Sequence, residues 1–402
     1  MREIRTVAVV GAGVMGAGIA QVATEAGLDV VLFDPLDGAT TRARQRIAGF
    51  LERKVDKGQL SAEEANAAID RIGEVRALSS LADADLVIEA VPEVLELKRE
   101  LFAELDGLVA ADAILATNTS SLSVARIASA TEHPDRVLGM HFFNPVPLMS
   151  LVELIPGPMT APGVVAALDD LARRLGKTPV VAADTPGFIV NRVQRALYLE
   201  AFRIFEEGLA GVDAIDDAMR QIGFRMGPFE LADVVGTDVN LAAGEAIFAG
   251  FHDDPRYRPA QLQQRVVDAG RLGRKTGAGY YDYDADGTRR EPWAALTQRP
   301  EGSPRLPPIE PPQIEARVLA NIVNEAASAV ADGVAAPEAI DTAMRLASNW
   351  PEGPLAWGER IGLDPVVHTL DALHLAVPDG RYRVTPLLRS LALSGGSFFS
   401  QT

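Results

Sequence analysis

Short apolar runs alternate with longer helical patterns over the first part of the chain. The runs are "TVAVVG", "DVVLFD", "ADLVIEAV", "AILATN", "RVLGMHFF" and "VVAAD". Such alternation is typical of βαβ units, in which a helix connects two parallel strands. It predicts an α/β domain over residues 1–185, with a doubly wound parallel sheet covered by helices on both faces.

The pattern changes after "DTPGFIVNR", where strand signals stop and apolar residues recur at helical spacing. A mainly helical domain is therefore predicted for residues 186–298. The next stretch contains "RPEGSPRLPPIEPPQ", and proline can neither continue a helix nor pair centrally in a sheet. Residues 299–312 are therefore predicted to be an extended linker.

The residues after this linker repeat the helical domain. "NEAASAVADGVAAPEAIDTAM" aligns with "LEAFRIFEEGLAGVDAIDDAM" 125 positions earlier, and "GPLAWGERIGLD" aligns with "GPFELADVVGTD". Such self-similarity indicates an internal duplication, so residues 313–402 are predicted to form a second, degenerate copy. Ala316 of this copy stands where the first copy has Asn191.

Composition excludes several classes of protein. The chain has no cysteine, which excludes disulfides, thiolate nucleophiles and Cys-based zinc sites, and we expect no metal site. Its net charge of -17 disfavours binding to nucleic acid or to an anionic membrane. No apolar run of about 18 residues and no signal-peptide pattern occurs, so a cytoplasmic location is expected.

The stretch "VAVVGAGVMGAGIAQVATEAG" carries a G-x-G-x-x-G pattern between a predicted strand and a predicted helix. This context favours a loop that binds a dinucleotide pyrophosphate at the helix N-terminus; the loop residues are Gly11, Ala12, Gly13, Val14, Met15 and Gly16. Asp34 ends the next predicted strand, where a carboxylate can accept hydrogen bonds from a ribose. Because a 2'-phosphate would face a like charge there, NAD is expected as the cofactor rather than NADP.

The stretch "GMHFFNPVPLMSLVE" holds a candidate acid/base pair, His141 and Glu153. Oxidation of an alcohol by a nicotinamide needs a base for the hydroxyl proton, and histidine titrates near neutrality. A carboxylate on the other ring nitrogen would fix the tautomer and stabilise the imidazolium. From these residues alone, a core histidine and an exposed glutamate are as good an interpretation as an acid/base pair.

Together with "DLVIEAVPEVLELK", "TNTSSL", "DTPGFIVNR", "MGPFELAD" and "GRKTGAGYYDY", these motifs make the chain resemble the L-3-hydroxyacyl-CoA dehydrogenase family over almost its full length. Among its members, the chain is similar to 3-hydroxybutyryl-CoA and 3-hydroxyadipyl-CoA dehydrogenases with a duplicated helical domain. The resemblance implies a Rossmann-type NAD-binding domain. It also implies reversible, NAD-dependent oxidation of an L-3-hydroxyacyl-CoA to the 3-oxoacyl-CoA, as in β-oxidation.

The resemblance also implies roles for individual residues. His141 would be the general base and Glu153 its partner, while Ser120 and Asn191 would hydrogen-bond the reacting oxygen of the substrate. Besides the glycine loop, the implied cofactor contacts are Asp34, Glu93, Lys98, Asn144 and Lys275.

Coenzyme A needs cationic groups, and residues 42–57 are rich in arginine and lysine. Lys54 and Lys57 are the predicted contacts for its phosphates, although a solvated helix face is an equally good interpretation. Phe50 occupies a position where family members have a serine that contacts CoA. This departure leaves an acyl carrier protein open as the alternative carrier.

Three further alternatives remain open. The enzyme could act on another hydroxy acid, or the chain could bind NAD(H) without turnover, as a sensor or a crystallin-like protein.

With a glycine loop and Asn191 only in the first part of the chain, one active site per chain is predicted. The duplicated helical domain could make the chain an internal pseudo-dimer, so either a monomer or a homodimer is compatible with the sequence.

Overall fold

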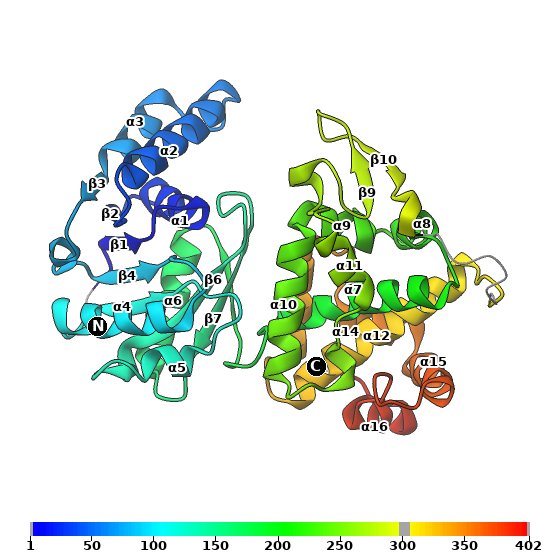
Figure 1. The fold of residues 1–402 in the computed structure, drawn as a ribbon. Helices are drawn as coiled ribbons and strands as arrows, with labels where there is room; N and C mark the ends of the chain where they lie inside the picture. Colours follow the sequence, from blue (N-terminus) through cyan, green and yellow to red (C-terminus); the bar gives the residue numbers. More distant parts are fainter. Residues whose placement is uncertain (1–2, 297–305, 400–402) are drawn as a thin grey trace. The chain divides into compact units, whose positions relative to one another are not determined.

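A computed structural model describes residues 3–296 and 306–399. The chain divides into two compact units, residues 1–188 and 189–402 (Figure 1). Half of the predicted linker, residues 299–305, lies outside the described residues. Among the described residues, no helix has the length and apolar character needed to cross a bilayer.

The first unit is built on one sheet with the strand order β3-β2-β1-β4-β5-β6-β7-β8. Its strands are β1 (Thr6–Val10), β2 (Asp29–Phe33), β3 (Ile72–Val75), β4 (Leu86–Glu89), β5 (Ile114–Thr117), β6 (Val137–Phe142), β7 (Leu151–Pro156) and β8 (Thr178–Val181). Its helices are α1 (Val14–Glu25), α2 (Ala39–Asp56), α3 (Ala62–Asp70), α4 (Leu95–Leu108), α5 (Val124–Ala128) and α6 (Pro162–Arg174), with 3-10 turns η1 (Leu78–Leu81) and η2 (Pro134–Arg136).

Alternating side chains of the central strand enter two different cores. Val7 and Val9 of β1 join one apolar cluster with residues of α1, α2 and α6, whereas Ala8 and Val10 join another with residues of α4 and α5. A strand buried on both faces reads as a continuous apolar run, which is why "TVAVV" lacks polar alternation. The predicted doubly wound α/β domain is confirmed.

One pair of strands differs from the predicted parallel sheet. β6 and β7 run antiparallel, while the other neighbouring pairs within this eight-stranded sheet are parallel. A parallel crossover needs about a dozen or more residues, usually with a helix, and residues 143–150 between these strands contain no helix. The connection therefore reverses the chain direction.

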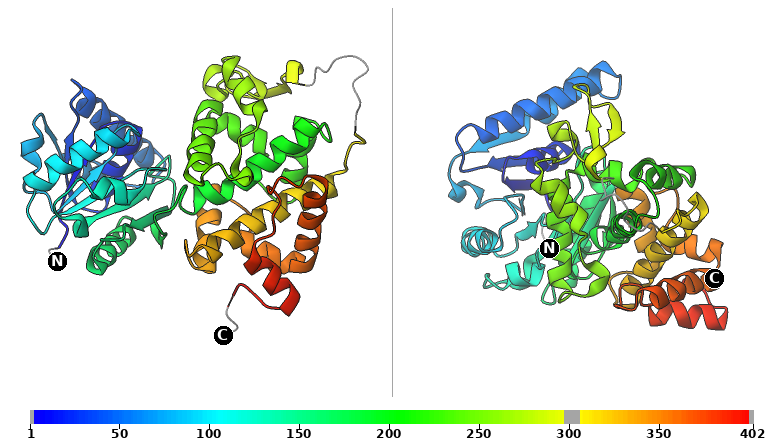
Figure 2. Two further views of the ribbon diagram at one scale, coloured as in Figure 1. Left: turned by 60° about the horizontal axis from the view of Figure 1, so that its bottom comes forward. Right: turned by 45° about the vertical axis from the view of Figure 1, so that its right-hand side comes forward.

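The second unit is mainly helical (Figure 2). Its helices are α7 (Val190–Glu207), α8 (Val212–Gln221), α9 (Pro228–Val235), α10 (Thr237–Gly250), α11 (Gln261–Asp268), α12 (Pro311–Ala331), α13 (Pro337–Ser348), α14 (Pro354–Ile361), α15 (Leu363–Ala376) and α16 (Pro386–Ser394), with 3-10 turns η3 (Pro255–Tyr257), η4 (Arg274–Thr276) and η5 (Ala294–Leu296). Helices α7 to α11 are followed by α12 to α16 in the same order and at the predicted offset, so the two repeated all-α parts of the fold are confirmed.

Two local features of this unit differ from the sequence prediction. Strands β9 (Tyr281–Tyr283) and β10 (Arg289–Pro292) form a small antiparallel sheet where no further strand was predicted. Helix α12 begins at Pro311, inside the predicted linker, because proline is tolerated in the first turn, whose N–H groups need no intrahelical partner.

The two helical copies pack on each other through α7 and α12. Arg192 of α7 donates from Nε to Glu325 of α12 at 2.7 Å. In the reciprocal pair, Arg317 of α12 donates from Nε to Glu200 of α7 at 2.8 Å. Both pairs join residues that are 125 positions apart from their counterparts, which is the pattern of a twofold, isologous interface.

Candidate active site

The glycine loop follows β1, and its three glycines differ in what surrounds them. A Cβ on Gly11 would lie 2.6 Å from the Ala90 oxygen, at a φ of +100°, and a Cβ on Gly16 would lie 1.8 Å from the Gly11 oxygen. No atom lies within 4 Å of a Cβ on Gly13, which precedes α1 as its N-cap without a side-chain cap. The loop therefore leaves backbone N–H groups and open space for a pyrophosphate.

Asp34 lies beside this loop, directly after β2. Its Oδ2 accepts the backbone N–H of Ala12 at 2.8 Å, and its Oδ1 accepts that of Leu36 at 2.9 Å. These bonds fix the carboxylate next to the glycines, and carboxylate oxygens have further lone pairs for ribose hydroxyls. The position fits the predicted role in binding the adenosine half of NAD.

His141 and Glu153 face each other directly across the antiparallel pair β6 and β7. The distance from His141 Nδ1 to Glu153 Oε2 is 2.7 Å, and both side chains are buried. Because a carboxylate only accepts hydrogen bonds, the bond assigns the ring proton to Nδ1 and leaves Nε2 as the basic nitrogen. The His141 ring also packs against Phe143 and Phe188, with centroid distances of 4.4 and 5.9 Å.

Ser120 lies in the loop after β5, and Glu93 holds this loop. Glu93 Oε1 accepts the backbone N–H of Ser120 at 2.8 Å and the Thr119 hydroxyl at 2.7 Å. Burial alone would raise the pKa of Glu93, but the Lys98 ammonium and these hydrogen bonds outweigh it and hold the pKa below its usual range. Glu93 is thus a charged anchor for the loop, in addition to its predicted cofactor contact.

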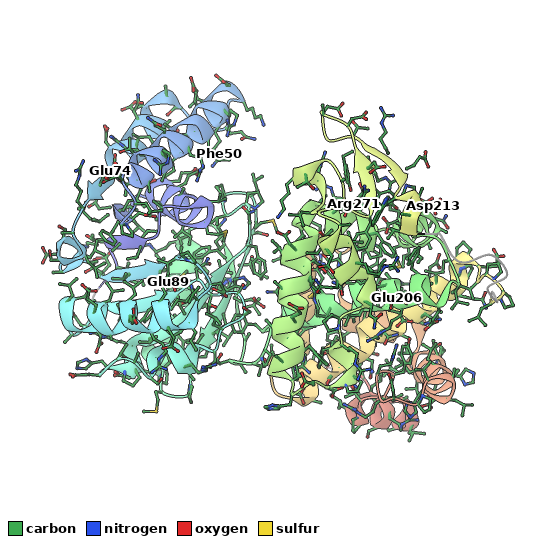
Figure 3. The ribbon with its side chains drawn as sticks, in the orientation of Figure 1. Phe50, Glu74, Glu89, Glu206, Asp213 and Arg271 are labelled. Atoms are coloured by element: carbon green, nitrogen blue, oxygen red, sulfur yellow. The ribbon has the colours of Figure 1, made fainter. Side chains whose placement is uncertain are left out.

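Lys98 occupies a different environment from the one expected for a direct cofactor contact. Its side chain is 1% exposed, and its Nζ lies 2.6 Å from Glu89 Oε1 and 3.3 Å from Glu93 Oε2. Figure 3 shows Glu89 inside the first unit, and this residue ends β4. The structure shows Lys98 as the buried counter-charge of two glutamates; its contact with the cofactor stays a prediction.

Sequence reasoning missed three polar residues of this region. Glu89 accepts hydrogen bonds from the Thr117 hydroxyl at 2.7 Å and from Lys98 Nζ. Asn118 accepts the backbone N–H of Phe142 at 2.8 Å, which ties the loop that carries Ser120 to the strand that carries His141. An acidic residue inside the apolar run "LVIEAV" was the available signal for Glu89. Asn118 gave none, because its partner is a backbone group from a distant strand.

These groups meet at one edge of the sheet. The glycine loop, Glu93, Ser120 and His141 follow or end β1, β4, β5 and β6, which are consecutive neighbours in the sheet and run parallel. Their carboxyl ends therefore lie along the same edge, and the strand order reverses between β1 and β4, where ligands bind in open α/β sheets. The exposed Asn144 follows β6 at this same edge.

The predicted CoA contacts lie at the end of α2. Lys57 is exposed and forms no ion pair with any described residue, whereas Lys54 Nζ lies 2.5 Å from Glu25 Oε2. Phe50 carries the Arg53 guanidinium over its ring, 4.4 Å from the centroid. Lys57 is therefore more available to a phosphate than Lys54, and both contacts stay predictions.

The two remaining predicted residues belong to the helical unit. Asn191 lies in the first turn of α7. Lys275 Nζ lies 2.7 Å from both carboxylate oxygens of Asp238, and the hydrogen bond from Lys275 lowers the pKa of Asp238. The structure describes the two units separately, so the predicted contacts of Asn191 with substrate and of Lys275 with cofactor stay predictions.

Comparisons with known proteins agree with this geometry. Residues 6–185 match the family model described as 3-hydroxyacyl-CoA dehydrogenase, NAD binding domain, and residues 187–283 and 314–397 match its C-terminal domain. The chain is 38% identical to the 3-hydroxyadipyl-CoA dehydrogenase of Escherichia coli K12, over 98% of each chain. It is 44% identical to a 3-hydroxybutyryl-CoA dehydrogenase of Bradyrhizobium diazoefficiens, over 70% of this chain and 96% of the other.

A solved structure extends this likeness to the whole fold. The crystal structure of 3-hydroxybutyryl-CoA dehydrogenase from Escherichia coli K12 superposes with a TM-score of 0.90 at 38% identity, covering 98% of this chain and 100% of that one. Fold and site together define an NAD-dependent dehydrogenase. The chain belongs to the 3-hydroxyacyl-CoA dehydrogenase family, which confirms the predicted activity class and cofactor and sets the non-catalytic alternatives aside.

Proposed function

We propose that His141 is the general base in the NAD-dependent oxidation of an L-3-hydroxyacyl-CoA to the 3-oxoacyl-CoA. The observation that carries this proposal is the buried bond of 2.7 Å between His141 Nδ1 and Glu153 Oε2. With Nδ1 donating to the carboxylate, Nε2 accepts the proton of the substrate hydroxyl. Glu153 stabilises the imidazolium that results.

NAD⁺, when bound by the glycine loop and Asp34, supplies the acceptor for the hydride that leaves carbon 3. His141 releases the proton again in the reverse direction, when the 3-oxo group is reduced. Phe143 and Phe188 pack on the imidazole, and the His141 side chain is buried. These contacts hold the ring in one orientation, which favours proton transfer from a positioned substrate.

Ser120 and Asn191 are proposed to hold the reacting oxygen. Both side chains are neutral, so they can hydrogen-bond an oxygen that changes from hydroxyl to carbonyl without adding charge. Glu93 holds the backbone of Ser120, and Asn191 follows three residues after Phe188, which packs on His141. Three residues of chain span at most about 11 Å, so the sequence keeps Asn191 close to this aromatic contact.

The experiment that tests the base is His141→Gln. We expect turnover to fall by about a hundredfold to ten-thousandfold, the usual contribution of a general base, with NAD⁺ affinity nearly unchanged. The matched control is His133→Gln. His133 also faces a carboxylate, with 3.2 Å from Nδ1 to Asp106 Oδ2, but its side chain is 51% exposed. Normal turnover in His141→Gln, or an equal loss in the control, would contradict the assignment.

Coenzyme A is the proposed carrier, and Lys57 is the proposed contact for its phosphates. Two of the matches that cover nearly the whole chain are named for different acyl groups, adipyl and butyryl. Rates of NADH oxidation with acetoacetyl-CoA, 3-oxoadipyl-CoA and a long-chain 3-oxoacyl-CoA would identify the acyl preference. Equal rates with free 3-oxo acids would contradict the proposed carrier, and faster rates on an acyl carrier protein would favour the alternative.

We further propose that the chain is an internal pseudo-dimer with one active site. The reciprocal pairs are Arg192 with Glu325 and Arg317 with Glu200. Through them, the second helical copy covers the face of α7 that a second chain would otherwise cover. A monomer is therefore expected in light scattering after size exclusion at micromolar concentration. A stable dimer under these conditions would contradict the proposal.

A further inference from the structure

A cavity of about 950 Å³ lies in the helical unit, between the first copy and parts of the second. Its walls come from the end of α7, the segment around η3, the start of α11 and Arg381. Asn191 lies at the opposite end of α7 from Glu206, about 22 Å away along the helix at 1.5 Å per residue. The cavity is therefore separate from the site of the proposed catalysis.

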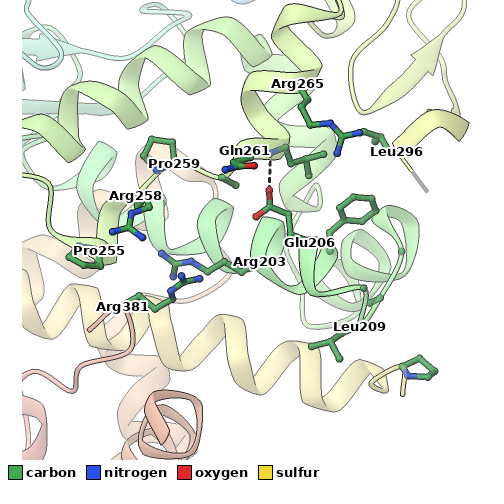
Figure 4. A pocket seen from close by; sticks show the side chains of 17 residues that line it. Arg203, Glu206, Leu209, Pro255, Arg258, Pro259, Gln261, Arg265, Leu296 and Arg381 are labelled. Atoms are coloured by element: carbon green, nitrogen blue, oxygen red, sulfur yellow. Dashed lines mark hydrogen bonds between the residues drawn. The ribbon is translucent and has the colours of Figure 1, made fainter. Parts of the chain in front are cut away.

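Among the described residues, four arginines line this cavity against one glutamate; they are Arg203, Arg258, Arg265 and Arg381. Figure 4 shows the guanidinium groups of Arg203, Arg258 and Arg381 directed toward one another at one end, with Arg265 beside Leu296 at the other. Such a concentration of positive charge is unexpected in a chain with a net charge of -17. Like charges in one cavity repel, so they favour a bound anion.

Two of these arginines are held by the protein, and two are available. Arg203 is 7% exposed and donates to the Arg256 oxygen at 2.8 Å, with Glu200 at 3.6 Å, and Arg381 pairs with Asp379 at 2.6 Å. The side chains of Arg258 and Arg265 are exposed and form no hydrogen bond or ion pair with any described residue. Glu206, the one carboxylate among the described lining residues, accepts the backbone N–H of Leu262 at 2.8 Å.

The second helical copy shows that the fold does not require two of these charges. At the duplication offset, Arg203 corresponds to Ser328 and Arg265 corresponds to Ser390. The corresponding helices α12 and α16 form with serine at these positions. Arg203 and Arg265 are therefore additions to the first copy, which points to a ligand rather than to folding, whereas Arg258 and Arg381 have arginine counterparts, Arg383 and Arg256.

The remaining lining gives the ligand a second character. Leu209, Leu262 and Leu296 are buried apolar residues of the cavity wall. A cavity of this volume lies at the upper end of the range for small-molecule sites, about 300–1,000 Å³, which exceeds what an inorganic ion fills. Guanidinium groups recognise phosphate oxygens through paired N–H donors.

We propose that this cavity binds an organic phosphate of nucleotide size, with the phosphates on Arg203, Arg258 and Arg381 and the organic part against the leucines. The site goes beyond the proposed dehydrogenase function and does not depend on it. Its ligand stabilises the helical unit by binding only the folded state.

The test is calorimetric titration of the NAD⁺-saturated protein with ADP, so that the glycine loop is already occupied. Saturable binding with a dissociation constant below about 1 mM is expected, weakened at least about tenfold in Arg258→Gln and in Arg381→Gln, since each loses a charged hydrogen bond to the phosphates. The matched control is Arg383→Gln, because Arg383 is the counterpart of Arg258 in the second copy and does not line the cavity.

Each outcome decides the proposal. Absence of saturable binding, or equal weakening in the control, overturns the site. Pyrophosphate that binds as tightly as ADP overturns the organic part, because the leucines would then contribute nothing. Dehydrogenase activity without ADP should be unchanged in both cavity variants, so failure of this site is distinguishable from failure of the catalytic assignment.

Discussion

The two helical copies of this chain form the same structure with different chemistry. In the first copy, Asp216 accepts the backbone N–H groups of Phe229 and Glu230 at 2.9 and 3.0 Å. In the second, Asp341 accepts those of Leu355 and Ala356 at 2.8 and 2.9 Å. The same buried carboxylate thus satisfies the N-terminus of α9 and of α14, whose orphan N–H groups need partners.

The difference lies in side chains that the shared framework does not use. Asn191, proposed to hold the substrate oxygen, corresponds to Ala316, and the cavity residue Arg203 corresponds to Ser328. The capping aspartates and the ion-paired residues Glu200 and Glu325 are identical between copies. The comparison of the copies therefore separates shared residues of the helical framework from Asn191 and Arg203, for which we propose roles in ligand binding.

The largest expected effect comes from breaking the reciprocal interface. Arg192→Met should destabilise the helical unit by about 3–5 kcal/mol, because it leaves Glu325 buried without its main counter-charge. The symmetric change Arg317→Met should do the same to Glu200. Thermal and urea unfolding would measure both.

A double variant sharpens this test. Arg192→Met combined with Glu325→Met should cost less than the sum of the two single changes, with a coupling of about 0.5–3 kcal/mol. The exposed control Arg360→Gln, at a surface pair with Glu352, should change stability by less than about 1 kcal/mol. If Arg317→Met proved no worse than this control, the two halves of the interface would not be equivalent.

The second prediction concerns the asymmetry in chemistry. Asn191→Ala should lower kcat by about 10²–10³, the usual loss when a donor to the reacting oxygen is removed, while the fold stays intact. The mirrored change Ala316→Asn in the second copy should leave steady-state rates unaltered. Equal kcat in Asn191→Ala and the parent would show that the copies differ at this position without catalytic consequence.

Local patterns predicted much of this molecule because period and punctuation are local properties. The glycine loop, the strand before it and Asp34 follow from spacing alone, and the repeat follows from self-similarity. The antiparallel direction of β7 does not follow from spacing, since a run such as "SLVELI" has the same apolar pattern in either direction.

The pairing of His141 with Glu153 depends on the register across that turn, which is fixed by the path of residues 143–150 and not by the strands themselves. Burial of Lys98 was likewise hidden, because its partner Glu89 lies nine positions away on the preceding strand. Charged groups that neutralise each other inside the fold have no sequence period of their own. The sequence thus proposed candidate residues for the site, whose roles stay predictions, but it did not indicate that Glu89 and Lys98 form a buried charged pair.

The smallest expected effect compares the two capping aspartates by pH. Burial raises the pKa of Asp216 to about 7 and that of Asp341 to about 6, in spite of their backbone donors, from an ordinary value of 3.8. Because each folded pKa is raised, the folded state holds the proton more tightly than the unfolded state. The stability that each carboxyl contributes is complete below about pH 4 and is lost as the pH rises through the folded pKa.

Asp216→Asn should therefore flatten the fall in unfolding temperature between about pH 4 and pH 7, and Asp341→Asn should flatten it only up to about pH 6. The folded pKa values of the two aspartates differ by about one unit, so the pH-dependent loss of unfolding free energy that each variant removes should differ by roughly 1.4 kcal/mol. The deeper burial of Asp216, which is 0% exposed against 8% for Asp341, is the physical reason. Identical pH profiles in the two variants would mean that the buried caps, like the helices they hold, are equivalent between the copies.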